Sequence, residues 1–331
     1  MFALWHLSRS ADRRREGSLI LGPSAVCVFP GQGAQRVGMG RDLAESFACA
    51  RAVFEEVDDR LGFALSRRCF DGPIDVLALT EHAQPAILAA SIAAYRTLVE
   101  LTGLQPVAVA GHSLGEWSAL VAAGVLGLGD AAVGVRERGR LMQRAVPVGV
   151  GAMAALLGTE IAVVEQLCAE AANGDVVSPA NLNGGGQIVV AGHVAAVDRV
   201  VAAATARRIR AQRLAVSAPF HCSLMEPAAV GLRGVLADLH YGEPMVPVVT
   251  SVEARAIASA SEVPSLLARQ VTAPVRWEET VRLLATLGAD IALEVGPGRT
   301  LAGLIKRITP TWRCEASGDV AEISKVREAF E

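Results

Sequence analysis

The chain has 331 residues, of which 52% are hydrophobic and 20% charged, and its formal net charge is −3. This composition can bury a sizeable core in one large domain or two smaller ones, and the small negative charge gives no general attraction to nucleic acid or to an anionic membrane. No apolar run reaches the length of a membrane span. We therefore expect a globular protein whose partners are neither nucleic acid nor membrane.

Six cysteines are scattered along the chain without Cys-x-x-Cys or zinc-ligand spacing. They are Cys27, Cys49, Cys69, Cys168, Cys222 and Cys314. This usage is typical of small core residues in a reducing compartment. We therefore predict a cytoplasmic protein.

Residues 1–24 differ from the rest of the chain. They have a short apolar start followed by an arginine cluster, whereas a secretory signal has its charge first and a longer apolar stretch after it. Asp12 and Glu16 count against an organellar leader. We expect a disordered extension, or an upstream start codon that is not the natural one.

Strands and helices alternate from residue 24 onward. Residues 24–30 predict an apolar strand that ends in Pro-Gly, and residues 31–35 predict a loop. Residues 42–61 and 80–100 have apolar positions at helical period and predict two helices. Thr80 is expected to cap the second of these helices, which has Pro85 in its first turn.

Residues 107–123 predict a strand, a tight turn and a helix around the motif Gly111-His112-Ser113-Leu114-Gly115. In this context the G-x-S-x-G pattern indicates a nucleophile elbow, which lifts Ser113 off the carboxyl end of the strand. Glycine at 111 and 115 fits a turn with little room for side chains. The free N–H groups at the helix start suit a developing oxyanion. The simpler alternative is a glycine-rich turn with a capping serine.

One arginine of the predicted helix 130–145 lies on its apolar face. Arg136, Arg140 and Arg144 are spaced by four and form one solvated stripe. Arg138 lies about 200° around the helix from Arg136, so it needs an anion, because burying an unpaired charge is costly. That anion is either a carboxylate of this chain or a group on the substrate, and the pattern alone does not decide between them.

A second unit is predicted at residues 149–216. Strands at 151–158, 176–181, 187–192 and 209–217 alternate with helices at 159–173, opened by Thr159, and 194–207. The order β-α-β-β-α-β is that of a ferredoxin-like unit. Because the α/β pattern continues on both sides, we predict a larger α/β unit of residues 25–148 and 217–331 with a mainly parallel sheet, and a ferredoxin-like subdomain of residues 149–216 inserted into it.

The rest of the α/β pattern follows this unit. The predicted strands are 246–251 and 290–295, and the predicted helices are one led by Met225, 263–271, 278–288 and 300–308. The tail from Pro310 is polar and poorly patterned.

Ser113 needs a base, and three histidines follow it in the chain. His193 closes a predicted strand, and His240 lies in a polar stretch at a helix end. His221, between a strand and a helix, is the best candidate. No acidic residue is obviously placed as a third member, which leaves a Ser-His dyad.

As a whole, the chain resembles the malonyl-CoA:acyl-carrier-protein transacylases, the acyltransferases that load carrier proteins in fatty-acid and polyketide synthesis. The resemblance runs from about residue 25 to about residue 308. The motifs that carry it are FPGQGAQ at 29–35, AQPA at 83–86, GHSLGEW at 111–117, RGRLMQRAVP at 138–147, ANLN at 180–183, GQIVVAG at 186–192, SAPFHCSLMEPAA at 217–229, RQVTAPVRW at 269–277 and EVGPGRTLAGLIKRI at 294–308.

The resemblance implies that the larger unit, residues 25–148 and 217–331, is an α/β-hydrolase-like core. It also implies a role for each matched position. Ser113 would be the acylated nucleophile and His221 its base. Gln32 and Leu114 would supply the two N–H groups of the oxyanion hole. The substrate-binding residues would be Arg138, which holds the malonyl carboxylate, Gln270, whose main-chain carbonyl also holds His221, and Phe220 and His112 beside the catalytic pair.

The implied function is transfer of a malonyl group from malonyl-CoA to the phosphopantetheine thiol of an acyl carrier protein through a malonyl-serine, in ping-pong order. No metal or tightly bound cofactor is expected, and a monomer is expected. Alternatives are a serine hydrolase that releases acyl groups to water, and a non-catalytic docking subunit, which the intact Ser113 and His221 argue against. The carrier could belong to fatty-acid synthesis, to a polyketide synthase or to malonate decarboxylase.

Three features of the sequence depart from the resemblance. Trp117 stands where tyrosine is common, Ala34 where serine is common, and three consecutive glycines at 184–186 replace a less flexible loop. None is an implied catalytic position. Phe220 before the base favours malonyl over methylmalonyl, because methylmalonyl-selective polyketide acyltransferases tend to have serine there and glutamine at the position of Leu114.

Overall fold

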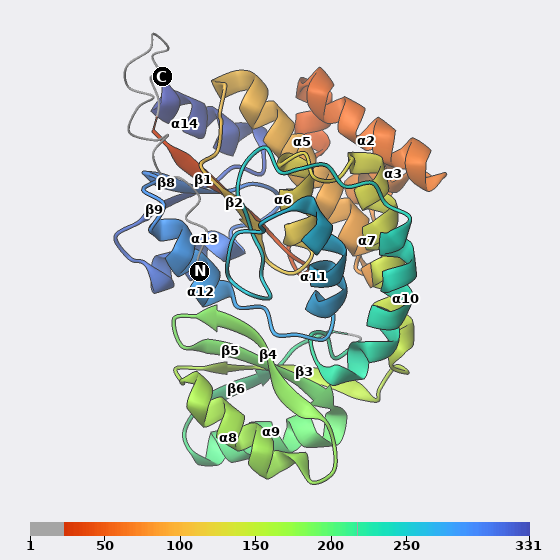
Figure 1. The fold of residues 1–331 in the computed structure, drawn as a ribbon, viewed down its shortest axis with the longest axis vertical. Helices are drawn as coiled ribbons and strands as arrows, with labels where there is room; N and C mark the ends of the chain where they lie inside the picture. The colour runs from red at the N-terminus through yellow and green to blue at the C-terminus, as the bar shows by residue number, and fades with distance from the viewer. Residues whose placement is uncertain (1–22, 217) are drawn as a thin grey trace.

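The computed structural model describes residues 23–331 except residue 217. The extension expected at the N-terminus therefore lies, up to residue 22, outside the described residues. Two sheets organise the chain, with helices packed around them (Figure 1). The sheets differ in strand direction and in size, and the active-site candidates lie between them.

The first sheet is parallel, as predicted for the larger unit. In the described part of the chain it has five strands in the order β7-β2-β1-β8-β9, and all four neighbouring pairs are parallel. The strands are β1 (Ala25–Phe29), β2 (Val109–Gly111), β7 (Val248–Val249), β8 (Ile291–Glu294) and β9 (Arg313–Ala316). Such a sheet needs helices on both faces to bury its apolar residues.

The two faces of this sheet enter separate cores. Ala25, Cys27 and Phe29 of β1 belong to one cluster of buried residues, and the alternate residues Val26 and Val28 belong to another. The first cluster includes residues of α5 (Thr80–Thr102), α6 (Gly115–Ala122) and α7 (Leu128–Ala145). The second includes residues of α12 (Trp277–Ala285) and α13 (Thr300–Ile308). The alternation is the period-2 geometry of a strand.

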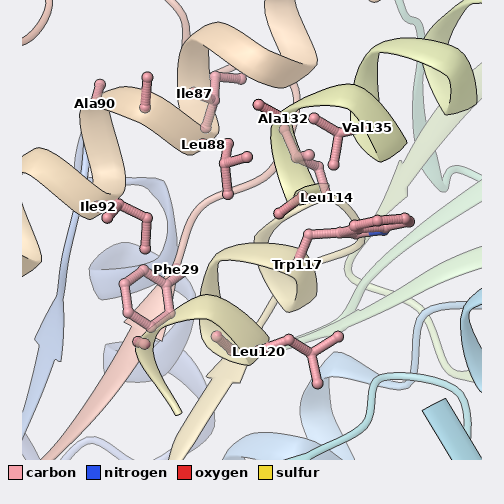
Figure 2. Close-up of a cluster of buried hydrophobic side chains, with 14 of the residues drawn as sticks. Phe29, Ile87, Leu88, Ala90, Ile92, Leu114, Trp117, Leu120, Ala132 and Val135 are labelled. Carbon is pink, nitrogen blue, oxygen red and sulfur yellow. The ribbon is translucent and has the colours of Figure 1, made fainter. Parts of the chain in front are cut away.

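The helix after the nucleophile candidate is buried between its neighbours. Figure 2 shows Leu114 and Trp117, at the start of α6, pointing toward Ala132 and Val135 of α7. A Cβ atom on Gly134 would lie 2.5 Å from the Trp117 ring, so glycine is needed there for the indole to pack. This packing fixes α6, and therefore the turn before it.

Further helices surround this core, and the single helix predicted at 42–61 is divided into two helices, α1 and α2. They are α1 (Arg41–Ser46), α2 (Ala48–Leu61), α3 (Leu65–Asp71), α4 (Ile74–Leu77), α10 (Glu226–Ala237), α11 (Val263–Gln270) and α14 (Val320–Phe330), with short 3₁₀ turns η2 (Ser223–Met225) and η3 (Ala260–Glu262). The single helix predicted at 42–61 is wrong, because Phe47 is extended, with φ −128° and ψ 130°. The Arg51 side chain donates to the Ala44 carbonyl, which satisfies an acceptor left open at the break.

The structure corrects three other details. Thr80 is the first residue of α5 rather than its cap, and its hydroxyl donates to Oε1 of Gln32. The helix predicted to open at Thr159 has Glu160 as its N-cap. The poorly patterned tail contains β9, which pairs with β8, and α14, which Asp319 caps by accepting from the Glu322 N–H.

The second sheet has the order β4-β5-β3-β6 and is antiparallel throughout. Its elements are β3 (Gly151–Leu157), α8 (Ile161–Ala172), β4 (Val177–Gly184), β5 (Gln187–His193), α9 (Val194–Ala206) and β6 (Arg210–Arg213). This confirms the predicted βαββαβ pattern and the α/β fold class. Figure 1 shows α8 and α9 on the side of this sheet that faces away from the parallel sheet.

Contacts of two kinds join this subdomain to the core. Met153, Ala155, Val189 and Ala191 of the antiparallel sheet belong to the main buried cluster. In addition, the Leu182 N–H donates to the Val275 carbonyl, and the Val275 N–H donates to the Ala180 carbonyl, at 2.8 and 2.9 Å. Strand β4 is therefore held against the segment between α11 and α12, close to the candidate site.

Two expectations from composition can be compared with the structure. In the part of the chain that is described, no helix is long and apolar enough to cross a membrane. All six cysteines are free thiols, and Cys27, Cys69, Cys168 and Cys222 are buried.

Candidate active site

The turn between β2 and α6 has the geometry of a nucleophile elbow. Ser113 has a positive φ of 52°, in the left-handed region that L-residues rarely adopt. A Cβ on Gly111 would lie 1.9 Å from the Gly115 carbonyl carbon, and one on Gly115 would lie 2.0 Å from the Phe29 oxygen. The prediction that the flanking glycines leave no room for side chains is confirmed. The strained turn holds the Ser113 hydroxyl at the carboxyl end of the sheet.

His221 is the histidine that the structure brings to Ser113. The Ser113 Oγ lies 2.8 Å from Nε2 of His221, and Nδ1 of His221 lies 2.9 Å from the main-chain oxygen of Gln270. A carbonyl oxygen only accepts, so Nδ1 carries the ring hydrogen. Nε2 is then left with its lone pair toward the Ser113 hydroxyl, which is the arrangement a general base needs.

The surroundings keep His221 neutral. The side chain is 4% exposed, and burial, followed by the charge of Arg138, lowers its pKa from 6.5 to about 3. Both effects disfavour the imidazolium, because neither low polarity nor a neighbouring cation tolerates an added positive charge. At neutral pH the imidazole is therefore in the proton-accepting form.

The other two histidine candidates lie elsewhere. The His193 Nδ1 accepts a hydrogen bond from the Val176 N–H at 3.0 Å within the antiparallel sheet. His240 is exposed, and its Nδ1 lies 3.9 Å from a carboxylate oxygen of Asp130. Neither contacts Ser113, so only His221 has the geometry of the base.

Arg138 lies buried beside Ser113. It is 2% exposed, and it donates to Gln84 Oε1 at 2.7 Å, to Gln270 Oε1 at 2.9 Å and to Ser113 Oγ at 3.0 Å. Among the residues that the structure describes, no carboxylate pairs directly with it, and its Nε has no partner. Of the two anions considered from the sequence, a directly paired carboxylate of this chain is not found.

Burial also acts on the guanidinium itself. It lowers the pKa of Arg138 to about 10, and the negative charge of Glu116 opposes that shift. The group therefore stays charged at neutral pH, although every atom that accepts from it is neutral. A carboxylate that entered beside Ser113 would meet a buried, charged guanidinium that can donate from two nitrogens.

Two main-chain N–H groups near Ser113 have no acceptor. Within the described residues, neither the Gln32 N–H nor the Leu114 N–H donates a hydrogen bond. The loop of Gln32 lies directly on the elbow, because a Cβ on Gly31 would be 2.4 Å from the His112 oxygen. Leu114 has helical dihedrals at the start of α6, where N–H groups point away from the helix. Two free donors from adjacent segments suit an oxyanion.

Phe220 and His112 directly precede His221 and Ser113 in the chain. Phe220 is 8% exposed and belongs to the main buried cluster. The His112 Nε2 lies 2.9 Å from Asn183 Oδ1 of β4, and its ring packs edge-on against Trp277 with the centroids 5.6 Å apart. Burial lowers the pKa of His112, and the bond to Asn183 opposes that shift. The antiparallel sheet thus fixes a residue next to the nucleophile.

Several residues around the site carried no role in the sequence analysis. Gln84 binds Arg138, and Asn183 binds His112. Glu116 and Ser251 are buried and contact each other and Gln270. Polar residues inside otherwise apolar runs are the signal that could have found Gln84 and Glu116. In the described residues, no group of three or more His, Cys, Asp or Glu side chains is placed to hold a metal ion.

The chain is similar to known proteins over nearly its whole length. Residues 26–321 match the model of the acyl transferase domain. The malonyl CoA-acyl carrier protein transacylase of Escherichia coli K12 is 44% identical over 302 residues, which are 91% of this chain and 98% of that protein. The corresponding protein of Haemophilus influenzae is 45% identical and is covered to 97%, with 91% of this chain aligned.

Solved structures give the same result. That of the malonyl CoA-acyl carrier protein transacylase of Coxiella burnetii has a TM-score of 0.92 and 38% identity, and the match covers 95% of this chain and 99% of that one. A second solved structure is a complex of a type II polyketide synthase acyl-carrier protein with its malonyl-transacylase. The matching chain has a TM-score of 0.90 and 44% identity, and the match covers 92% of this chain and 99% of that one.

Proposed function

The chain belongs to the acyl transferase domain family, and we propose that it transfers a malonyl group from malonyl-CoA to the phosphopantetheine thiol of an acyl carrier protein. The observation that carries the proposal is the buried guanidinium of Arg138, 3.0 Å from the oxygen of a serine that also contacts a neutral histidine. The names of the similar proteins support the choice of malonyl-CoA and of a carrier protein.

In the first half-reaction Ser113 attacks the thioester. His221 Nε2 takes the hydroxyl proton as the bond from Oγ to the carbonyl carbon forms. Two hydrogen bonds, from the N–H groups of Gln32 and Leu114, stabilise the negative charge on the former carbonyl oxygen of the tetrahedral intermediate. When the carbon–sulfur bond breaks, the imidazolium returns its proton to the sulfur of coenzyme A, which leaves a malonyl ester on Ser113.

The second half-reaction reverses these steps with a different thiol. His221 takes the proton of the carrier thiol, whose sulfur attacks the ester carbonyl. The carbon–oxygen bond then breaks, and the proton returns to Ser113 Oγ. During both halves Arg138 holds the malonyl carboxylate with two donors, which places the thioester end at the nucleophile.

The finer assignments are also proposals. We propose fatty-acid or polyketide synthesis as the pathway, a cytoplasmic location on the basis of six free cysteines, a monomeric enzyme, and chemistry that uses no metal or bound cofactor. The phosphopantetheine belongs to the carrier protein and acts as substrate.

Mass spectrometry tests the acyl-enzyme. Incubation with malonyl-CoA alone should add one malonyl mass to the peptide that contains Ser113, and addition of a phosphopantetheinylated carrier protein should move that mass to the carrier. The variant Ser113→Ala should form no adduct. A malonyl adduct that persists in this variant would show that Ser113 is not the acylated residue. Steady release of coenzyme A without any carrier protein would instead identify a hydrolase.

A further inference from the structure

Glu116 is a buried carboxylate beside the candidate site, and none of the described residues pairs with it as a direct cationic partner. It is 2% exposed, and within the described residues no Arg, Lys or His nitrogen forms an ion pair with it. Its Oε2 accepts from the Ser251 N–H at 3.0 Å, from the Ser251 hydroxyl at 2.6 Å and from the Gln270 side-chain amide at 2.7 Å. It lies in the first turn of α6, where the helix dipole favours negative charge.

The Gln270 side chain connects this anion to the buried cation of the site. Its Nε2 donates to Glu116, and its Oε1 accepts from Arg138 at 2.9 Å. The amide of Gln270 is completely buried, so no water competes for either end. Glu116 can only accept and Arg138 can only donate, so the two charges together fix the direction of the amide between them.

We propose that Glu116 is the resident counter-charge of Arg138, transmitted through the Gln270 amide, and that it sets how tightly the site holds a malonyl carboxylate. The inference rests on the proposed function. Arg138 has only neutral acceptors in direct contact, and an unbalanced buried cation is strongly destabilising. Glu116 supplies the missing negative charge one side chain away, while the direct contacts of Arg138 remain open to exchange for a substrate carboxylate.

The negative charge of Glu116 therefore has two opposite effects. It stabilises the enzyme without an acyl group, and it weakens the binding of a malonyl group. Without an acyl group the site holds one positive and one negative charge. A malonyl group adds a second negative charge, which Arg138 attracts and Glu116 repels. Neutralising Glu116 should therefore destabilise the unloaded enzyme more than the malonyl-loaded enzyme, whereas an acetyl group, which has no carboxylate, should give no such compensation.

Thermal unfolding of Glu116→Gln tests this directly. The protein is melted alone, in excess malonyl-CoA and in excess acetyl-CoA, with loading verified by mass. We expect a lower Tm for the unloaded variant, and a Tm increase on malonyl loading that exceeds the wild-type increase by about 1.5 °C or more, the scale of about one kilocalorie per mole in a protein of this size. Acetyl loading should give equal increases in the two proteins.

Ser251→Ala is the matched control. It removes one hydrogen bond from the same carboxylate oxygen and leaves the charge of Glu116 in place. Its Tm should fall, but its increase on malonyl loading should equal that of wild type. An equal increase in Glu116→Gln as well would show that Glu116 is only a structural hydrogen-bond acceptor and would overturn the proposal.

A second measurement tests the proposal even if Glu116→Gln folds poorly. In the double variant Glu116→Gln/Arg138→Met both buried charges are gone, so it should be more stable than Glu116→Gln alone, or fold where the single variant does not. A double variant no more stable than the single one would contradict the coupling. Failure of the wild type to form any malonyl adduct would refute the proposed function instead, and the double-variant comparison would still test the pairing of charges.

Discussion

The Oγ atom of Ser113 lies 2.8 Å from Nε2 of His221, although 108 positions separate the two residues. Both residues have positive φ, 52° for Ser113 and 62° for His221. A backbone in this region is costly for residues other than glycine, and it persists only where the surrounding structure fixes it. The folded chain therefore holds Ser113 and His221 in contact before any substrate binds.

The first prediction concerns His221. Because Nε2 of His221 lies 2.8 Å from Ser113 Oγ and is the proposed proton acceptor, His221→Ala should lower the single-turnover acylation rate by ~10²–10⁴, the usual contribution of general base catalysis. The control is His193→Ala, whose ring lies in the antiparallel sheet and should leave the rate nearly unchanged. A large loss of rate in His193→Ala together with near-normal acylation by His221→Ala would show that His221 is not the base.

The second prediction concerns pH. The base must be neutral to accept a proton, and burial together with Arg138 lowers the pKa of His221 to about 3. An ordinary histidine protonates below pH 6.5, and acylation would then decline from there. We expect the acylation rate, measured by rapid quench, to show no titration between pH 7.5 and about pH 5. A tenfold decline for each pH unit below 6.5 would contradict this environment of the imidazole.

The third prediction concerns Arg138. Replacement by alanine removes the proposed donors for the malonyl carboxylate. The activation free energy obtained from kcat/KM for malonyl-CoA should therefore rise by about 1.5–3 kcal/mol or more, the range for hydrogen bonds to charged groups. Transfer from acetyl-CoA, measured with the same carrier protein, should fall much less. Equal losses for the two donors would show that Arg138 supports the fold and does not select the acyl group.

The fourth prediction concerns Phe220, which packs in the main core directly before the base. An α-methyl group on the substrate would require this ring to move, and overpacking typically costs ~1–3 kcal/mol. Wild type should therefore prefer malonyl-CoA over methylmalonyl-CoA by roughly 5- to 150-fold in direct competition, and Phe220→Ser should narrow the difference. Equal use of both substrates by wild type would refute this role.

The elements with strong periodicity were predictable from sequence, and the exceptions have physical reasons. The nucleophile elbow combines a buried strand with two glycines that no other residue can replace, so local sequence determines it. The break at Phe47 was not predictable, because apolar residues keep helical period across it. Strand β9 was missed because, in the described part of the chain, it lies at the sheet edge and pairs with β8 alone, and because it alternates exposed and half-buried residues.

The site was partly predictable for a similar reason. Arg138 stood out because the helix repeat places it among apolar neighbours, and it is indeed buried. Its partners Gln84 and Gln270 come from α5 and the end of α11, 54 and 132 positions away, and no local pattern joins them. Glu116 was passed over because one acidic residue in a first helical turn is ordinary, and only the tertiary structure shows that no solvent reaches it.

The position of the antiparallel sheet in the chain also divides the candidate catalytic residues between two halves of the sequence. Ser113 and Arg138 precede strands β3 to β6, whereas His221 and the Gln270 carbonyl that holds it follow them. A single cut of the chain anywhere from β3 to β6 therefore leaves the serine on one fragment and the histidine on the other. Noncovalent contacts between the fragments, such as the parallel pairing of β1 with β8, would then have to hold the pair together.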